Sequence, residues 1–171
     1  DNSGNAFVIE FSGEPSGVAH TAYLRSIDFT TRTMGAADNL SLTGGATIYV
    51  SGSGDVAMSP SGQMFFVVDN KLFTPNYQAY TGTGANLTCT YIDTVQAPSN
   101  NFVGLTYADG ETIAAFSGGG CPFREIDPLT GDTSIIIKSG TVYSSADMAS
   151  VVSGIGAAKK LVSAIPTGTP N

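Results

Sequence analysis

Residues 59–68 read SPSGQMFFVV, a turn of small residues that ends in glycine, followed by an apolar run. The same arrangement occurs at residues 1–9, DNSGNAFVI, and at residues 108–115, ADGETIAA. The three closing glycines are 58 and 48 residues apart. Intervals of this size are typical of architectures built from one repeated supersecondary unit. The chain is therefore predicted to contain three copies of one module.

Composition places the chain among β-rich globular proteins. Of its 171 residues 42% are hydrophobic, which is enough for a core, and only 12% are charged. Glycine, serine and threonine are abundant, as in many secreted β-proteins. The net charge of −7 disfavours nucleic acid and anionic membranes as partners, because both need clustered lysine and arginine. No apolar run is long enough to predict a membrane-spanning helix.

Each module is predicted to be an antiparallel meander of four short strands joined by tight turns. The third module gives the clearest pattern, with strands at residues 102–107, 112–116, 123–126 and 134–138. In the middle module we expect strands at residues 55–58, 64–68, 71–73 with a looser continuation to Tyr80, and 87–95. The first module starts directly at its glycine turn, with strands at 6–11, 23–29 and within 34–50. It therefore lacks an opening strand.

The third strands of the first and last modules share a sequence motif. Residues 25–31 and 124–130 both fit R-x-I-D-x-x-T, at a separation of 99 residues. Asp28 and Asp127 close these strands, and we expect their carboxylates to cap the turn that follows. Near the C-terminus, residues 145–150 echo residues 54–59, an opening strand. The chain thus closes with the kind of strand that its first module lacks.

With these turns and strands, the chain resembles the four-stranded blades of secreted bacterial β-propellers, most closely at residues 126–131, IDPLTG. The resemblance implies an all-β fold with blades at about 1–54, 55–100 and 101–150, and a linker at 151–171. Residues 157–171 are similar to segments that lead into immunoglobulin-like surface repeats. Three blades cannot close a ring, so the chain is expected to be a fragment of a larger propeller or to be completed by oligomerisation. A β-sandwich is the alternative fold, and a short helix within 146–165 is an alternative for the tail.

Candidate sites for chemistry are few. Cys89 and Cys121 could form a disulfide, be free or be unrelated. The single histidine, His20, is expected to be an exposed loop residue, since no nucleophile motif or further histidine accompanies it. Acidic turns at 1–5, at 69–70 and at Asp127 with Asp132 could offer oxygen ligands to calcium, although none has the spacing of an EF-hand loop. No cofactor and no metal site is predicted.

Tyrosines give the best candidate for a binding surface. Tyr77 and Tyr80 lie in the irregular part of the middle module, and tyrosine suits both sugar stacking and protein contacts. Packing within a half-buried strand is the simpler interpretation of the same residues. Asn39 and Asn86 begin two N-glycosylation sequons, which matter only in a eukaryotic secretory pathway.

These observations predict a secreted or cell-surface module without enzymatic activity, acting in adhesion, ligand binding or structural assembly. Its expected partners are other copies of itself, neighbouring domains of a larger protein or a glycan. One alternative is a carbohydrate-binding lectin built from oligomerised blades, and another is a filament subunit joined by strand exchange. An enzyme with its active site in a propeller channel would need residues from absent blades.

Overall fold

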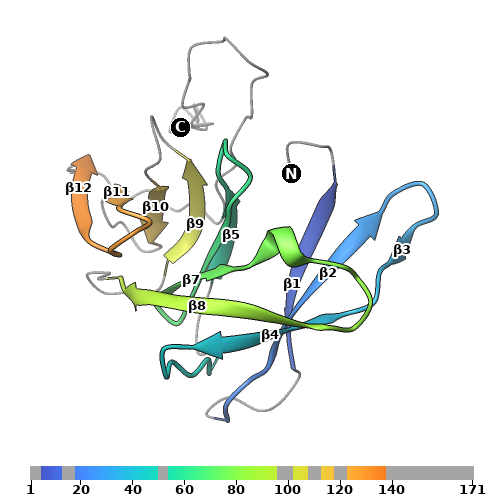
Figure 1. The fold of residues 1–171 in the computed structure, drawn as a ribbon. Coiled ribbons are helices and arrows are strands. Elements are labelled where there is room, and N and C mark those ends of the chain that lie inside the picture. The colour runs from blue at the N-terminus through green and yellow to red at the C-terminus, as the bar shows by residue number, and fades with distance from the viewer. Residues whose placement is uncertain are drawn as a thin grey trace, which may run out of the picture.

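The part of the chain that the structure describes is all-β, as predicted, with one short 3-10 helix. The computed structural model describes residues 5–12, 18–49, 54–95, 102–107, 113–117 and 123–137. The strands are β1 (Ala6–Phe11), β2 (Ala22–Asp28), β3 (Thr33–Met34), β4 (Asp38–Thr43), β5 (Gly54–Met58), β6 (Met64–Val68), β7 (Lys71–Pro75), β8 (Asn86–Thr94), β9 (Phe102–Tyr107), β10 (Ile113–Ser117), β11 (Phe123–Ile126) and β12 (Thr133–Ile137) (Figure 1). A three-residue 3-10 helix, η1 (Tyr77–Ala79), follows β7.

The strands form three consecutive antiparallel meanders close to the predicted spans. We call them the first meander (β1 to β4), the middle meander (β5 to β8) and the third meander (β9 to β12). In the first meander β3 and β4 both pair with β2, and the break at Gly35–Ala37 separates them. Among the described strands, this meander thus has three strand positions and no counterpart of β5 and β9, the opening strands of the others. The predicted tail at 151–171 lies outside the described residues.

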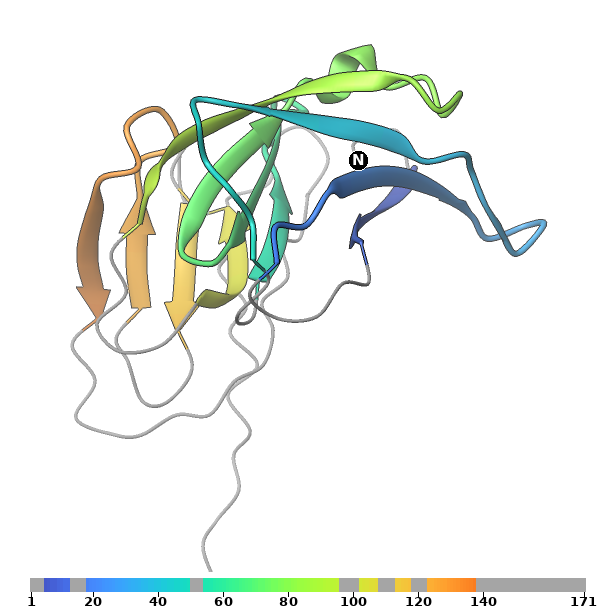
Figure 2. The same cartoon turned by 90° about the horizontal axis from the view of Figure 1, so that it is seen from below.

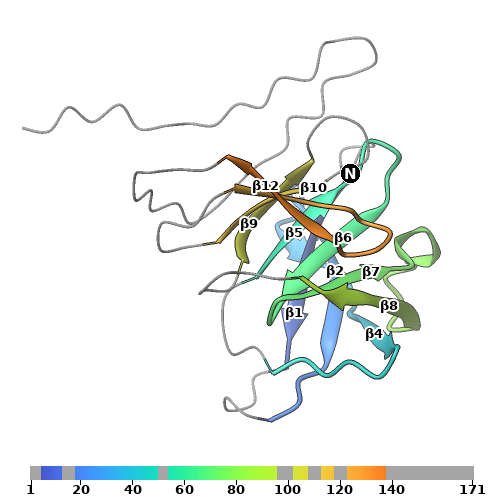
Figure 3. The same cartoon turned by 90° about the vertical axis from the view of Figure 1, so that its left-hand side faces the viewer.

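The first two meanders are not separate sheets, because their last strands pair with each other. β4 and β8, the last strands of the first two meanders, pair in parallel from Asn39↔Asn86 to Thr43↔Thr90. The first two meanders therefore share one sheet of order β1-β2-β4-β8-β7-β6-β5, which curls so that its two ends approach the same core (Figure 2). The third meander forms a second sheet of order β12-β11-β10-β9 (Figure 3).

Strand β6 of the middle meander is buried on both faces. All five residues of β6 are buried. Since alternate side chains of a strand point to opposite sides of the sheet, both faces of β6 must be covered. Met64, Phe66 and Val68 face the first core, which lies between the first and middle meanders. Phe65 and Val67 face the second core, which lies between the middle and third meanders. Strand β5 also contacts β9, so the middle and third meanders meet along their opening strands as well.

Two hairpins in different meanders have the same geometry. After Asp28 and after Asp127 the chain makes a turn in which the aspartate accepts hydrogen bonds from backbone N–H groups two or three residues ahead. Both turns end in the left-handed region, at Arg32 with φ 57° and at Gly131 with φ 78°. The R-x-I-D-x-x-T motif therefore specifies one hairpin used twice.

Arg32 holds a backbone conformation that glycine adopts without strain at the equivalent position. An L-residue other than glycine pays about 1 kcal/mol or more in the left-handed region. We expect Arg32→Gly to raise the free energy of unfolding by about 0.5 to 1 kcal/mol, measured by urea denaturation. The control is Arg32→Ala, which keeps the strain and should give no gain. Equal stability of the glycine and alanine variants would contradict the interpretation.

The predicted continuation of the third strand of the middle meander to Tyr80 is not a strand. β7 ends at Pro75, and η1 begins at Tyr77. A proline has no N–H and cannot donate to a β-ladder, so the strand ends there. The chain then turns into the 3-10 helix, and the Asn76 N–H donates to the Thr88 carbonyl of β8 at 2.8 Å. This turn brings both tyrosines back over the first meander.

Candidate functional site

Tyr77 and Tyr80 form an aromatic cluster with Phe7 of β1. The two tyrosine rings are stacked with centroids 6.5 Å apart, and each meets the Phe7 ring edge-on, at 4.9 and 5.4 Å. Both tyrosines are half-buried, and burial raises the pKa of Tyr77. The predicted tyrosine surface is therefore only partly open to a ligand. Much of each ring packs the middle meander onto the first.

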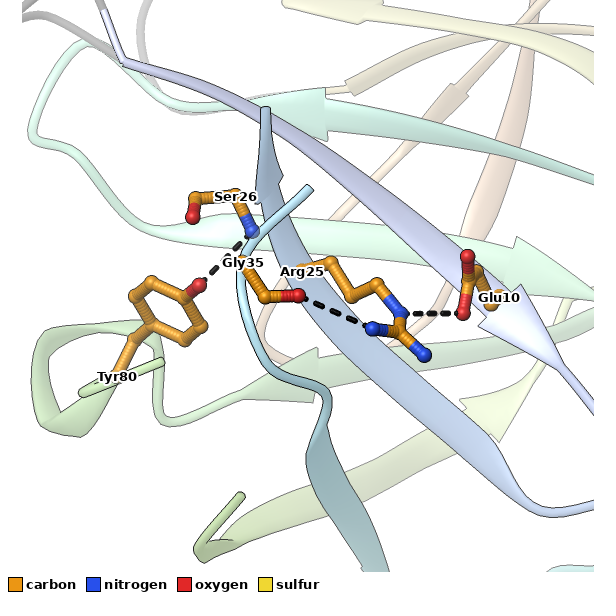
Figure 4. A network of polar contacts seen from close by, with 5 residues as sticks. All are labelled: Glu10, Arg25, Ser26, Gly35 and Tyr80. Atoms are coloured by element: carbon orange, nitrogen blue, oxygen red, sulfur yellow. Dashed lines mark hydrogen bonds and ion pairs between the residues drawn. The ribbon is translucent and has the colours of Figure 1, made fainter. Parts of the chain in front are cut away.

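The Tyr80 hydroxyl joins the cluster to β2. It accepts a hydrogen bond from the Ser26 N–H at 2.8 Å (Figure 4). The space around the hydroxyl is tight, because a Cβ added at Gly82 would lie 3.0 Å from this oxygen. Tyr80 is thus a fixed contact between residues 54 positions apart in the sequence.

Arg25 lies beside the same contact. Its Nε donates to Glu10 Oε2 at 2.7 Å and its Nη1 donates to the Gly35 carbonyl at 3.0 Å (Figure 4). The side chains of Arg25 and Glu10 are 32% and 35% exposed, so solvent screens their attraction and the pair contributes little stability. The arginine instead orients the break between β3 and β4. Its counterpart Arg124 in the third meander donates to Thr133 Oγ1 at 3.4 Å.

A cavity of about 520 Å³ opens next to this cluster. The residues that give it chemical character are Asn5, Phe7, Asp28, Phe29, Thr30 and Tyr80. Phe29 is 76% exposed, so its ring is open to a ligand at this rim. Hydrogen bonds from the Thr31 side chain and from the backbone of Thr31 and Thr30 lower the pKa of Asp28, so the rim of the cavity carries a fixed negative charge.

Loss of the Tyr80 hydroxyl tests its structural contact. Tyr80→Phe leaves the Ser26 N–H without this acceptor and is expected to lower the free energy of unfolding by about 1 kcal/mol. Urea denaturation followed by circular dichroism measures the change. The control is Tyr49→Phe, because Tyr49 is 42% exposed and should change stability by less than about 0.5 kcal/mol. Equal effects of the two variants would show that the hydroxyl contact carries no stability.

A second cavity, of about 330 Å³, lies at the end of the β4–β8 pair. Tyr49, Lys71 and Tyr91 line it together with the glycine turn at Gly44. The Lys71 ammonium donates to the Thr47 carbonyl at 2.8 Å and lies 5.8 Å from the Tyr49 ring centroid. The lysine charge is thus engaged with the turn and the ring, which makes this cavity a structural feature of the first core.

Sequence reasoning missed Asp38, which is the most constrained polar residue in the described part of the chain. Its side chain is 0% exposed, and its carboxylate accepts five hydrogen bonds from the loop before β8. The donors are the backbone N–H groups of Thr81, Gly82, Gly84 and Ala85, at 2.8 to 3.1 Å, and the Thr81 hydroxyl at 3.3 Å. We call this loop, residues 81–85, the nest loop. Successive N–H groups that converge in this way form an anion-binding concavity.

The nest loop determines the ionisation of Asp38. Burial disfavours the charged form and would raise its pKa, but the backbone hydrogen bonds of Thr81, Gly84, Gly82 and Ala85 more than compensate. The pKa of Asp38 therefore lies below its usual value. Because Asp38 begins β4 and the nest loop leads into β8, the carboxylate fixes the register of the parallel pair. The signal in the sequence was the alternation TGTGA at 81–85, which supplies backbone donors without bulky side chains.

The other sequence candidates take structural positions where the structure describes them. Cys89 is a free thiol, fully buried in the first core, and burial raises its pKa to about 12. Its proposed partner Cys121 lies outside the described residues. His20 is half-buried rather than exposed, because its backbone bridges to Ile48 and its Nδ1 contacts the Ser12 carbonyl. Asp132 accepts a hydrogen bond from the Thr130 hydroxyl at 2.9 Å.

The described residues, 5–12, 18–49, 54–95, 102–107, 113–117 and 123–137, include neither a metal-ligand cluster nor a membrane-spanning helix. Within these ranges no group of three or more histidine, cysteine, aspartate or glutamate side chains is arranged to hold a metal ion. The acidic turn at residues 1–4 is outside them. Across the same part of the chain, no helix has the length and apolar character that crossing a bilayer requires.

Comparison of the chain with protein-family models, with curated proteins and with solved structures finds no match.

Proposed function

We propose that the chain is a secreted or cell-surface β-propeller module without catalytic activity, and that it acts in adhesion or structural assembly through copies of itself or neighbouring domains. The supporting observation is the packing of the meanders. The middle meander buries both faces of β6, whereas in the described part of the chain the first meander is one strand short at β1, the end of its sheet. When repeats pack against one another through their faces and opening strands, the terminal repeat leaves the equivalent face or strand edge without a neighbour.

The composition agrees with an exposed, secreted location. Low charge density with many small hydroxyl residues suits an extracellular β-protein. Three of the charged side chains, those of Asp38, Arg25 and Asp28, bond to backbone groups of the chain itself. The two cavities offer shape and aromatic surface without paired acid and base groups that chemistry would use.

Solution mass tests this function. We expect the full chain, of 17.5 kDa, to sediment as a dimer or a larger assembly at micromolar concentration. Analytical ultracentrifugation across a wide concentration range measures this directly. A chain that stays monomeric at every concentration would argue against self-assembly.

Glycan binding at the Tyr80 cavity is a second candidate function. The observation that favours it is the combination of an exposed aromatic ring, Phe29, with the charged Asp28 at one rim. Aromatic faces stack on sugars and carboxylates bind their hydroxyls. A glycan array probed with the full chain tests it, with Phe29→Ala as the variant expected to lose binding. Unchanged binding by this variant would exclude the cavity.

A further inference from the structure

The strand registers show which residues are equivalent in the three meanders. Ala6 pairs with Ile27 at the start of β1, and Ile113 pairs with Ile126 at the start of β10. Since Ile27 and Ile126 occupy the same place in the R-x-I-D-x-x-T motif, β1 and β10 are equivalent strands. The glycine turns before β1 and β6 extend this equivalence to β6.

In the other two meanders this second strand has a partner on each side. β6 pairs with β5 and with β7, and β10 pairs with β9 and with β11. Among the described strands, β1 pairs with β2 alone. The position that β5 and β9 fill in the other meanders is therefore open at β1, and Figure 2 shows β1 at the end of its sheet.

The open edge of β1 presents backbone donors. Just beyond β1, the Ser12 N–H donates to the Thr21 carbonyl, on the side of β2, at 2.9 Å. Backbone groups alternate in direction along an antiparallel strand, so the N–H groups of Phe7 and Ile9 point to the open side. The strand carries one charge, Glu10, which is held by Arg25, and has no proline or lysine. Within its own sequence the strand thus carries few of the devices that protect an edge from pairing.

The chain contains a segment that matches the missing strand. Residues 53–57, which lead into and form most of β5, read SGDVA, and residues 145–149 read SADMA. The shared aspartate has a defined role in β5. Asp55 Oδ2 accepts a hydrogen bond from the Leu105 N–H of β9 at 2.6 Å, and so ties one opening strand to the next.

We propose that residues 145–150 of a second copy of this chain add to the open edge of β1 as the opening strand of the first meander. The register of β5 on β6, transferred to β1, pairs Asp147 with Ile9, Met148 with Val8 and Ala149 with Phe7. In this register Asp147 takes the place of Asp55. Val56 of β5 is the residue equivalent to Leu105, and its N–H donates to Asp55 Oδ1 at 2.8 Å in the single chain. In the assembly this N–H of the accepting copy donates to the Asp147 carboxylate of the second copy instead.

We assign the strand to a second copy because the path within one copy is long for the few residues that link β12 to this segment. The first and third meanders contact opposite faces of the middle meander, through the first and second cores. From β12 to the open edge of β1 the chain would have to pass around two packed layers about 10 Å apart and across several strands about 4.8 Å apart. The eight residue steps from Ile137 to Ser145 span at most about 29 Å when fully extended, which leaves little slack for such a path. This inference rests on the proposed assembly function and specifies its contact.

Disulfide trapping between two different variants tests the contact. Val8 and Met148 fall on a pair without mutual hydrogen bonds, the kind in which two Cα atoms lie closest and a disulfide is geometrically allowed. Chains with Val8→Cys are mixed with chains with Met148→Cys under mild oxidation, all in a Cys121→Ser background. We expect a covalent heterodimer on a non-reducing gel. The matched control replaces Met148→Cys with Val162→Cys, which lies outside the SADMA segment and should give none.

A proline variant separates this contact from assembly in general. Met148→Pro should convert the sedimenting dimer to a monomer, whereas Val162→Pro should leave it intact. A dimer that survives Met148→Pro overturns the inference while the proposed function stands, and a wild-type monomer overturns both. A chain carrying both Val8→Cys and Met148→Cys that forms its disulfide as a monomer would show closure within one copy, which also overturns the second-copy contact.

Discussion

Replacing Asp38 with alanine is expected to lower the free energy of unfolding by about 3 to 5 kcal/mol, the largest effect of any single polar residue described here. The carboxylate is fully buried and accepts four backbone N–H groups of the nest loop. Without it these four donors lose their acceptor, and each donor left unsatisfied costs about 1 kcal/mol or more. Differential scanning calorimetry should show a fall in Tm of 10 °C or more.

Asp38→Asn gives the matched variant for charge. The amide keeps the size of the carboxylate but places an NH₂ donor against N–H donors, so we expect about half the loss of the alanine variant. The control is Asp93→Asn, because Asp93 is exposed and bonds only to the N–H of Thr94 beside it. Its effect should stay within about 0.5 kcal/mol. Equal effects of Asp38→Asn and Asp93→Asn would contradict the role of the nest loop.

The stability that Asp38 supplies should depend on pH in one direction. Its pKa in the folded chain lies below the value of about 3.9 of an unfolded chain, so folding favours the charged form. The contribution is complete above this unfolded value and is lost as the pH falls through the folded value. The difference in stability between the wild type and Asp38→Asn should therefore be constant from pH 7 to about 5 and shrink below about 4. A difference that grows on acidification would have the wrong sign.

Phe66→Ala should have the second large effect, a loss of about 3 to 5 kcal/mol in the free energy of unfolding. Phe66 is 2% exposed and stacks on Phe73 with ring centroids 5.0 Å apart. The alanine leaves a cavity in the first core between the first and middle meanders, which surrounding strands cannot collapse to fill. Chemical denaturation measures the loss.

Phe29→Ala is the matched control for Phe66→Ala. It removes the same ring from a side chain that is 76% exposed, and should cost less than about 0.5 kcal/mol. Phe65→Ala probes the other face of the same strand, in the second core. Hydrogen exchange should then show Phe66→Ala loosening β2 and β4, and Phe65→Ala loosening β9. The same pattern in both variants would mean that the two cores are not separate.

Local signals made most of the strands predictable. Neighbouring residues alone specify turns such as Asp69–Asn70, where both residues have positive φ. They also specify apolar runs such as Met64–Val68. The repeated R-x-I-D-x-x-T motif predicted equivalent strands, and the equivalent turns at Arg32 and Gly131 follow from it. The continuation of a strand to Tyr80 failed because Pro75 ended the ladder first.

Pairing between distant strands was not predictable in the same way. β4 and β8 are joined by no turn, so nothing local records that they lie side by side. Their sequences do carry one signal, which lies in the two stretches that contain the glycosylation sequons. Residues 39–43, NLSLT, and 86–90, NLTCT, are near copies, and they pair in register with Asn39 beside Asn86. The Asn39 amide donates to the Asn86 side chain at 2.8 Å.

The candidate site was predictable only in part. The positions of Tyr77 and Tyr80 in an irregular stretch were expected, but their burial against Phe7 depends on β1, about seventy residues earlier. Asp38 gave no local sign of its role, because an aspartate before a strand is usually exposed. Its partners are more than forty residues away along the chain.

The two-sided burial of β6 limits how this gene can gain or lose sequence. A deletion that removed the first meander would leave Met64, Phe66 and Val68 bare, and a deletion of the third would uncover Phe65 and Val67. Soluble descendants are therefore expected to differ by whole repeats inserted next to an existing one, with an end repeat whose outward side is polar. Truncated clones that begin near Gly54 should aggregate when expressed.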